Sequence, residues 1–183
     1  MAKRVRARQP TLDDDVVSLT PYSLRDVRAH LANEDDEFYR WFDLPKSTPE
    51  SVRAAIRRWQ RSWRGARRVI AFAIRDRAGR LAGGCEIRIV SPGIGEVSYW
   101  VGPDHRRRGY AARALRLLVG FGFGELGLRR IEAAADTRNA ASRAALGRAG
   151  FRQEGLQREK WEARDGRRDV AIYAVLASET GPA

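Results

Sequence analysis

A short basic turn is the part of this chain best suited to chemistry. It lies between an alternating, strand-like run (96–101) and an amphipathic run that indicates a helix, and it reads Arg106-Arg107-Arg108-Gly109-Tyr110-Ala111. The first N–H groups of a helix have no partner within it, and the helix dipole adds positive potential at that end. Gly109 allows the backbone to come close to an anion. We therefore predict that this turn binds a phosphate group.

The residues after the turn continue in an informative order. A second strand-like run (129–135) follows the helix, and then comes a segment of small and polar residues (136–142). Another helix runs to Ala149 and is followed by Gly150-Phe151. Asn139 is suited to cap the start of this helix, and Gly150 is suited to end it.

This order of parts resembles the GNAT family of acyl-CoA-dependent N-acetyltransferases. The family motif Gln/Arg-x-x-Gly-x-Gly/Ala is matched by Arg106, Gly109 and Ala111. Within the family the chain looks most like the branch that acts on ribosomal-protein N-termini, the RimJ/RimL type. The residues that carry this second likeness are Tyr99-Trp100-Val101-Gly102-Pro103, Asn139, Ser142 and Gly150-Phe151. The resemblance is dense over 96–151 and elsewhere rests on the order of elements.

The resemblance implies a cleft for acetyl-CoA, which serves as the acyl donor. Backbone amides of the turn would hold the pyrophosphate, and the strand before the turn would splay from its neighbour and pair with the pantetheine arm. Its backbone near Trp100 and Val101 would donate to the thioester carbonyl. The cofactor-binding residues implied in this way are Tyr99, Trp100, Val101, Arg106, Arg107, Arg108, Gly109, Tyr110, Ala111, Ala112, Asn139 and Ser142.

Acetyl transfer to an amine also needs a proton acceptor and a proton donor for the leaving thiolate. Many family members place a tyrosine seven residues after the capping asparagine, but Leu146 stands there and cannot donate a proton. Ser142 is the candidate in its place, although its hydroxyl could also serve as a second cap. Glu96 is the candidate base, with a strand carboxylate facing solvent as the alternative. The further carboxylates that could serve the acceptor are Glu154, Glu159 and Glu162.

The sequence leaves two classes of acceptor: a protein N-terminus, or a small amine such as an aminoglycoside, a polyamine or an amino acid. An α-amino group loses its proton near pH 8 and a lysine-type amine near 10.4, so the former needs less help from a base. The acidic run Glu34-Asp35-Asp36-Glu37 could bind a cationic acceptor or form a solvated loop. The tryptophans expected in the core, with a platform for the substrate as the alternative, are Trp41, Trp59, Trp63 and Trp161. A non-catalytic acyl-CoA-binding module is the rival hypothesis.

Composition bounds the remaining choices. The chain has 183 residues, 43% of them hydrophobic, which suits one domain at 15–178, with a disordered basic tail at 1–14 and a short C-terminal tail at 179–183. No apolar run approaches the roughly 18 residues of a membrane span, and none follows the basic start as in a secretory signal. The lone Cys85, expected in the core, allows no internal disulfide. We therefore predict a cytoplasmic protein without membrane contact.

The type of basic residue and the spacing of possible metal ligands argue against sequence-specific nucleic-acid binding and against a metal site. The net charge is +12, and of the 35 basic residues all but Lys3, Lys46 and Lys160 are arginines. An arginine bias can reflect genome composition, and no nucleic-acid recognition motif is present, so we expect no sequence-specific nucleic-acid binding. His30, His105 and Cys85 lack metal-ligand spacing, so we predict no metal. The oligomeric state stays open, with a homodimer among the options.

The periodicity predicts a mixed α/β fold. We expect an antiparallel meander, then strand–helix–strand–helix, and a terminal hairpin around Asp165-Gly166. The predicted strands are 16–19, 69–75, 81–90, 96–101, 129–135, 156–161 and 169–176, and the predicted helices are 23–31, one starting at 48–49, one starting at 109, and 139–149. The family resemblance implies the same architecture, the GNAT fold: a central, mixed, mostly antiparallel twisted sheet flanked by helices.

Overall fold

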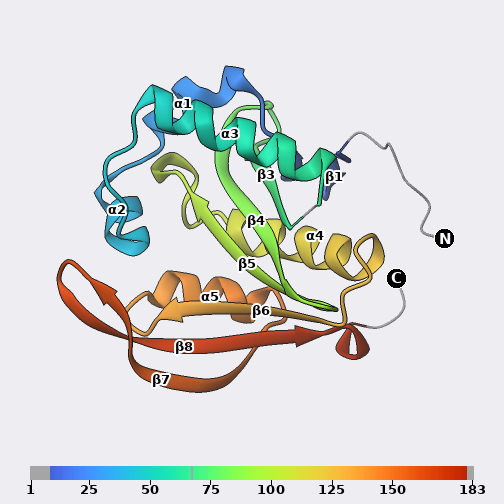
Figure 1. The fold of residues 1–183 in the computed structure, drawn as a ribbon, viewed down its shortest axis with the longest axis vertical. Coiled ribbons are helices and arrows are strands. Elements are labelled where there is room, and N and C mark those ends of the chain that lie inside the picture. Colours follow the sequence, from blue (N-terminus) through green and yellow to red (C-terminus); the bar gives the residue numbers. More distant parts are fainter. Residues whose placement is uncertain (1–8, 67, 181–183) are drawn as a thin grey trace.

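A computed structural model describes residues 9–66 and 68–180. Its centre is an eight-stranded sheet with the order β1-β2-β3-β4-β5-β6-β8-β7 (Figure 1). The strands are β1 (Leu12–Asp13), β2 (Ser18–Pro21), β3 (Val69–Arg75), β4 (Leu81–Ser91), β5 (Ile94–Val101), β6 (Arg130–Asp136), β7 (Arg152–Ala163) and β8 (Gly166–Leu176). The α-helices are α1 (Val27–Ala32), α2 (Asp36–Phe42), α3 (Pro49–Arg64), α4 (Tyr110–Gly124) and α5 (Ala140–Arg148). This is the mixed α/β fold that the sequence predicts.

The N-terminal elements differ most from the prediction. The first strand pairs as Ser18–Pro21, two residues later than its apolar pattern suggests. The predicted helix at 23–31 begins as a 3-10 turn, because Ser23 and Asp26 cap one another there, and then continues as α1. A segment with four aromatic residues, Phe38, Tyr39, Trp41 and Phe42, is not among the predicted helices but forms most of α2, whose N-cap Asp35 accepts from the Phe38 N–H at 3.0 Å.

The predicted tails fall largely outside the described residues. Residues 1–8 of the basic tail and 181–183 of the C-terminal tail lie there. Strand β1 lies within the stretch predicted as the basic tail and pairs antiparallel with β2. The Gln9 side chain also donates to the Ala71 carbonyl at 2.7 Å. In the described part of the chain, no helix is long and apolar enough to cross a membrane.

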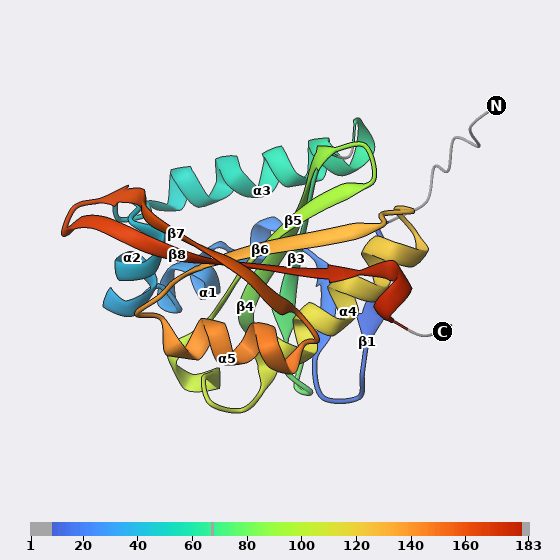
Figure 2. The same cartoon turned by 90° about the horizontal axis from the view of Figure 1, so that it is seen from below.

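The sheet separates two hydrophobic cores (Figure 2). Strand β3 shows how, because its side chains alternate between the faces. Phe72 points toward α4, where it packs with residues such as Leu115 and Leu118. Ala71 points to the opposite face and packs with Val52 and Ile56 of α3. Helix α3 can face the sheet because apolar residues recur along it every three or four positions, while its other side is charged.

The two central strands, β5 and β6, diverge in the middle of the sheet, and a cleft opens between them. β5 and β6 are parallel and pair only over 94–96 of β5 and 130–132 of β6. Beyond that point β5 stays bonded to β4 as far as Val101, and β6 stays bonded to β8 as far as Asp136. The backbone edge of β5 that faces β6 is therefore free of strand pairing from Val97 onward. This confirms the splayed strands that the family resemblance implied.

Candidate active site

A cleft of about 910 Å³ lies where β5 and β6 diverge. One wall is β5 with the basic turn and the start of α4, and the other is the end of β6 with the start of α5. Residues of α2 and Trp161 of β7 close one end. Of the predicted site residues, the cleft is lined by Glu96, Tyr99, Trp100, Val101, Arg106, Arg107, Gly109, Tyr110, Ala111, Ala112, Asn139 and Ser142. Arg108 is exposed and does not line it.

The basic turn forms the geometry that an anion site needs. A short 3-10 helix (Pro103–His105) leads into it, and Gly109 is the N-cap of α4 with φ 77°. Glycine has no side chain, so no N-cap side chain accepts a hydrogen bond from the first backbone N–H groups of α4. A Cβ on Gly109 would meet no atom within 4 Å, so its left-handed backbone and not space is what requires glycine.

That conformation gives a direct test. Replacing Gly109 by valine forces a β-branched residue into a left-handed backbone, which costs about 1–2 kcal/mol or moves the turn. We expect the free energy of unfolding to fall by that amount and affinity for coenzyme A to fall at least about tenfold. Urea denaturation and calorimetric titration with coenzyme A would measure the two effects. Gly120→Val, on the exposed side of α4, is the control, because it makes the same substitution where the backbone is not left-handed and a side chain meets no atom.

The Arg106 side chain has a structural role that the sequence did not reveal. Its two terminal nitrogens donate to Asp35 at 2.6 and 2.7 Å, and one of them also donates to Glu37 at 2.9 Å. Its Nε donates to the Val101 carbonyl at 3.0 Å. The hydrogen bond from Arg106 is the main cause that lowers the pKa of Asp35. Arg106 thus fastens α2 to the end of β5, and its charge is already neutralised.

A pair of hydroxyl groups joins the two walls of the cleft. The Tyr99 hydroxyl of β5 lies 2.7 Å from Ser142 Oγ and donates to the Ser142 carbonyl at 3.0 Å. Asn139 caps α5 by accepting from the Ser142 N–H at 2.9 Å, which fixes the position of Ser142. Burial raises the pKa of Tyr99 to about 12, so its phenol keeps its proton at neutral pH. Two uncharged hydroxyls, one from β5 and one from α5, therefore meet across the cleft.

The structure distinguishes the candidate bases by their positions and their partners. Glu96 is half-buried, lines the cleft and sits at the last paired position before β5 and β6 diverge. Glu154 instead forms a two-pronged ion pair with Arg130, one contact being 2.9 Å. Glu159 and Glu162 are exposed on β7 and are not among the residues that line the cleft.

The acidic run and the tryptophans take other places than the ones expected. Glu34 is buried and bound by His30 at 3.1 Å, by the Ser47 hydroxyl at 2.9 Å and by the Tyr39 phenol. Burial would raise the pKa of Glu34, but these three hydrogen bonds outweigh burial and lower it. Glu34 is therefore not solvated, and Asp35 and Glu37 are bound to Arg106, while Asp36 is exposed in the first turn of α2.

Aromatic side chains of α2 and β7 form part of the wall of the cleft. Trp59 and Trp63 pack on the cores as expected, but Trp41 and Trp161 line the cleft instead. The latter two stand there together with Phe38 and Phe42. Phe38, Trp41 and Phe42 have the sequence spacing of any buried helical face, so only the position of α2 at the cleft distinguishes them from core residues.

Most carboxylates that line this cleft are already held in ion pairs. Three carboxylates line it, and Glu37 is bound to Arg106 while Asp136 is bound to Arg138 at 2.9 Å. Burial would raise the pKa of Asp136, but hydrogen bonds from Arg138 and the charge of Arg168 outweigh burial and lower it. Within the described residues, Glu96 is the one lining carboxylate without a recorded ion pair.

Comparison with known proteins agrees with this geometry. The family model described as "Acetyltransferase (GNAT) domain" matches residues 17–152. The N-acetyltransferase p20 of Bacillus licheniformis, described as uncharacterized, is 34% identical over 87 residues, which are 48% of this chain and 49% of that protein. The alignment therefore spans about half the length of this curated relative.

Solved structures share the fold over nearly the whole chain. Mycobacterium smegmatis RimJ in complex with CoA-disulfide is 26% identical, with a TM-score of 0.83 over 95% of this chain and 89% of that one. The ribosomal-protein-S5-alanine acetyltransferase from Vibrio fischeri has a TM-score of 0.82 over 95% of this chain and 100% of that one, at 17% identity. With a family model that matches most of its length and a cleft between splayed strands, this chain belongs to the GNAT acetyltransferase family.

Proposed function

We propose that this protein transfers the acetyl group of acetyl-CoA to the α-amino group of a protein N-terminus, with a ribosomal protein as the acceptor. The observation that carries the proposal is the Tyr99–Ser142 hydroxyl pair across a cleft whose one end is the basic turn. RimJ, a GNAT protein of the same fold, was solved with a coenzyme A disulfide, which supports coenzyme A as the donor part. The lone, buried Cys85 supports a cytoplasmic setting.

The chain offers a group for each requirement of the donor side. The amides at the start of α4 would hold the pyrophosphate, with Arg107 adding charge at the cleft wall. The unpaired edge of β5 from Val97 to Val101 would hydrogen-bond the pantetheine arm as an added strand would. An N–H of that edge would stabilise the negative charge that develops on the thioester oxygen.

The transfer itself needs two proton movements. The acceptor amine, once deprotonated, attacks the thioester carbon; the new C–N bond forms and the C–S bond breaks, releasing the thiolate of coenzyme A. Ser142 would donate a proton to this sulfur and regain one from Tyr99, whose phenol is in contact with it and would be reprotonated by solvent water. Glu96, through water, would take the proton that the amine gives up.

The charge inventory of the cleft favours an α-amine over a polycation. An aminoglycoside or a polyamine brings several ammonium groups, and each would need a carboxylate near the reacting amine to offset its desolvation. Glu37 and Asp136 already hold arginines, so Glu96 alone is left for a cation. The aromatic end of the cleft suits the single side chain of an N-terminal residue instead. An α-amine also needs less help from a base because its pKa lies near 8.

The decisive experiment measures acetyl transfer across a panel of amines. Purified protein and acetyl-CoA would be incubated with N-terminal peptides of ribosomal proteins, with aminoglycosides and with polyamines, following thiol release and product mass. Each peptide would also be supplied with its N-terminus already acetylated and one internal lysine free. We expect products from free N-termini alone. Turnover of the blocked peptides or a preference for polyamines would overturn the α-amine proposal. Coenzyme A binding without any turnover would favour a binding module.

A further inference from the structure

The outer face of α3 carries a row of arginines that the cleft does not use. Arg53, Arg57, Arg61 and Arg64 are all exposed. At about 100° per residue they fall within an arc of about 80°, and at about 1.5 Å per residue they extend over roughly 16 Å. We call these four residues the α3 arginine row. Further exposed arginines beside it are Arg25, Arg28, Arg58 and Arg68.

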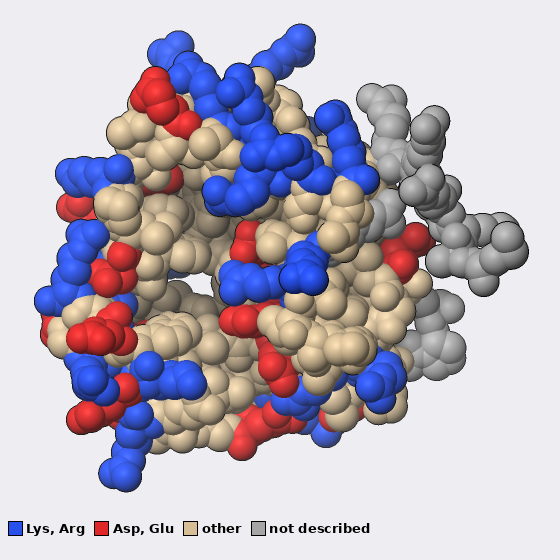
Figure 3. Space-filling view, viewed as in Figure 1, with Lys and Arg blue, Asp and Glu red and all other residues tan. Residues whose placement is uncertain are grey.

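The row is unlike the arginines of the rest of the fold. Elsewhere arginines pair with carboxylates, as Arg75 does with Asp26 and Arg130 does with Glu154. The structure records no ion pair for Arg57, Arg61 or Arg64 in the part of the chain that it describes, and Arg53 pairs with Glu50 at 3.3 Å between two exposed side chains. In Figure 3 blue atoms gather over α1 and α3, while blue and red alternate over the hairpin of β7 and β8.

We propose that the α3 arginine row binds the phosphate backbone of double-stranded RNA. Guanidinium groups hold phosphate by paired hydrogen bonds, and a straight row suits a backbone of regularly spaced charges. A protein partner would call for an apolar or aromatic centre, and the exposed face of α3 has none. Single-stranded RNA is recognised by stacking on aromatic side chains, which this face also lacks. The binding is independent of base sequence, because the row offers contacts to phosphates alone.

The position of the α3 arginine row relates RNA binding to the proposed acetyl transfer. Helix α3 follows α2 directly across residues 43–48, and α2 lines the acceptor end of the cleft. An RNA duplex on α3 would therefore lie on the same side of the molecule as the entering amine. This inference rests on the proposed function, since a ribosomal-protein N-terminus is presented next to RNA. The row would hold the particle while its protein N-terminus reaches the cleft.

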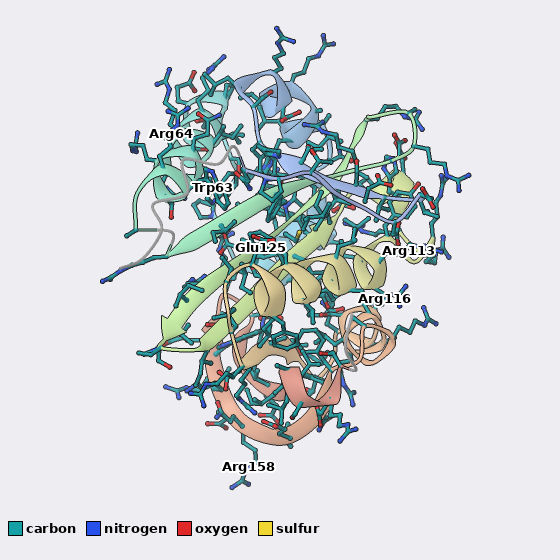
Figure 4. The ribbon with its side chains drawn as sticks, turned by 90° about the vertical axis from the view of Figure 1, so that its right-hand side faces the viewer. Trp63, Arg64, Arg113, Arg116, Glu125 and Arg158 are labelled. Atoms are coloured by element: carbon teal, nitrogen blue, oxygen red, sulfur yellow. The ribbon has the colours of Figure 1, made fainter. Side chains whose placement is uncertain are left out.

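A matched pair of triple variants tests the inference. The test variant is Arg57→Gln, Arg61→Gln and Arg64→Gln, which keeps helix propensity and removes three charges. The control variant removes the same charge elsewhere by Arg116→Gln, Arg129→Gln and Arg158→Gln, all of them exposed. Figure 4 shows Arg64 and Arg158 projecting from opposite ends of the molecule. The probe is a 20-base-pair RNA duplex of arbitrary sequence, with a DNA duplex of the same sequence in parallel, followed by fluorescence anisotropy over a salt series.

We expect wild type and control to bind the RNA duplex alike. In the test variant the slope of log K against log salt should fall by about 2–3, and affinity near 0.1 M salt should fall on the order of a hundredfold. No RNA binding by wild type, an equal loss in both variants, or tighter binding of the DNA duplex would overturn the proposal. Acetylation of a free peptide should be the same in all three proteins. A protein that acetylates the peptide but ignores the RNA duplex would refute this inference and leave the proposed function intact.

Discussion

Ser142→Ala is expected to lower kcat for acetyl transfer about 100-fold while the KM for acetyl-CoA stays within about threefold. The hydroxyl would act only when the thiolate departs, so its loss is felt in the transition state and not in binding. Leu146 stands where a phenolic donor would otherwise be, and it is buried in the core. Steady-state kinetics with a peptide acceptor gives both parameters. Ser142→Thr keeps a hydroxyl and should recover most of kcat; equal losses in the two variants would refute the proton-donor role.

Tyr99→Phe tests the other half of the pair. It removes the hydroxyl that contacts both the carbonyl and Oγ of Ser142 and leaves the ring, so kcat should fall roughly tenfold with the fold intact. Tyr173→Phe is the matched control, because Tyr173 is also buried but hydrogen-bonds Arg143 and Gln153 and does not line the cleft. That control should leave kcat unchanged. An effect of similar size in both variants would mean that Tyr99 only supports the fold.

The raised pKa of Tyr99 predicts the pH profile as well. Burial raises this pKa to about 12, so the phenol stays protonated until the pH approaches that value. The rate in wild type should therefore rise with pH as the acceptor amine loses its proton, and it should not fall again below about pH 10. A descending limb with an apparent pKa below 10 that disappears in Tyr99→Phe would contradict this assignment.

Arg168→Met should give a large loss of stability, about 3–5 kcal/mol. Arg168 is 4% exposed; it bonds Asp165 at 2.9 Å, donates to the Arg40 carbonyl at 2.9 Å and lies 3.6 Å from the buried Asp136. Removing it leaves the Asp136 carboxylate with Arg138 as its remaining arginine partner and removes the hydrogen bond that joins the hairpin to Arg40 of α2. At about 2–4 °C per kcal/mol for a chain of this size, the Tm should fall by roughly 10 °C.

Arg167 provides the control for this effect. It is the adjacent residue but fully on the surface, so Arg167→Met should change the free energy of unfolding by no more than about 0.5 kcal/mol. Acid unfolding gives a second readout. The lowered pKa of Asp136 contributes stability that is present above the ordinary value of 3.8 and is lost as the pH falls through the lowered pKa. Arg168→Met should raise that pKa and move acid unfolding to higher pH; unchanged curves would show that Arg138 alone suffices.

The sequence predicts the fold well where periodicity and end signals coincide. Helix α3 starts at Pro49 after the Thr48 cap, as predicted, because both signals are local. The basic turn is equally local, and it lines the predicted cleft. Strand β1 has only two residues, too few for any alternation to be detected, and it forms because β2 offers it an edge. Short pairing of this kind is decided by tertiary contact.

The unpredicted parts of the site depend on contacts between distant residues. Arg106 meets Asp35 across 71 positions, and Arg168 meets Arg40 across 128. An arginine in a basic turn and an acidic run before a helix each have a plausible local role, so neither pattern points to the other. Tyr99 and Ser142 were each identified as site residues, but their contact follows only from the way β5 and α5 face each other. Contacts between side chains on opposite walls of a cleft produce no recognisable spacing of residues in the sequence.

In the proposed reaction, the tie from Arg106 to Asp35 and Glu37 would couple the two substrate sites. The same guanidinium holds the end of β5, through the Val101 carbonyl, and the start of α2, which the proposal assigns to the acceptor side. A shift of the turn on binding acetyl-CoA would then be transmitted to α2, and a shift of α2 on binding the amine would return to the turn. Linkage requires the effect to be mutual: by whatever factor one substrate alters the affinity for the other, it is altered in return by the same factor.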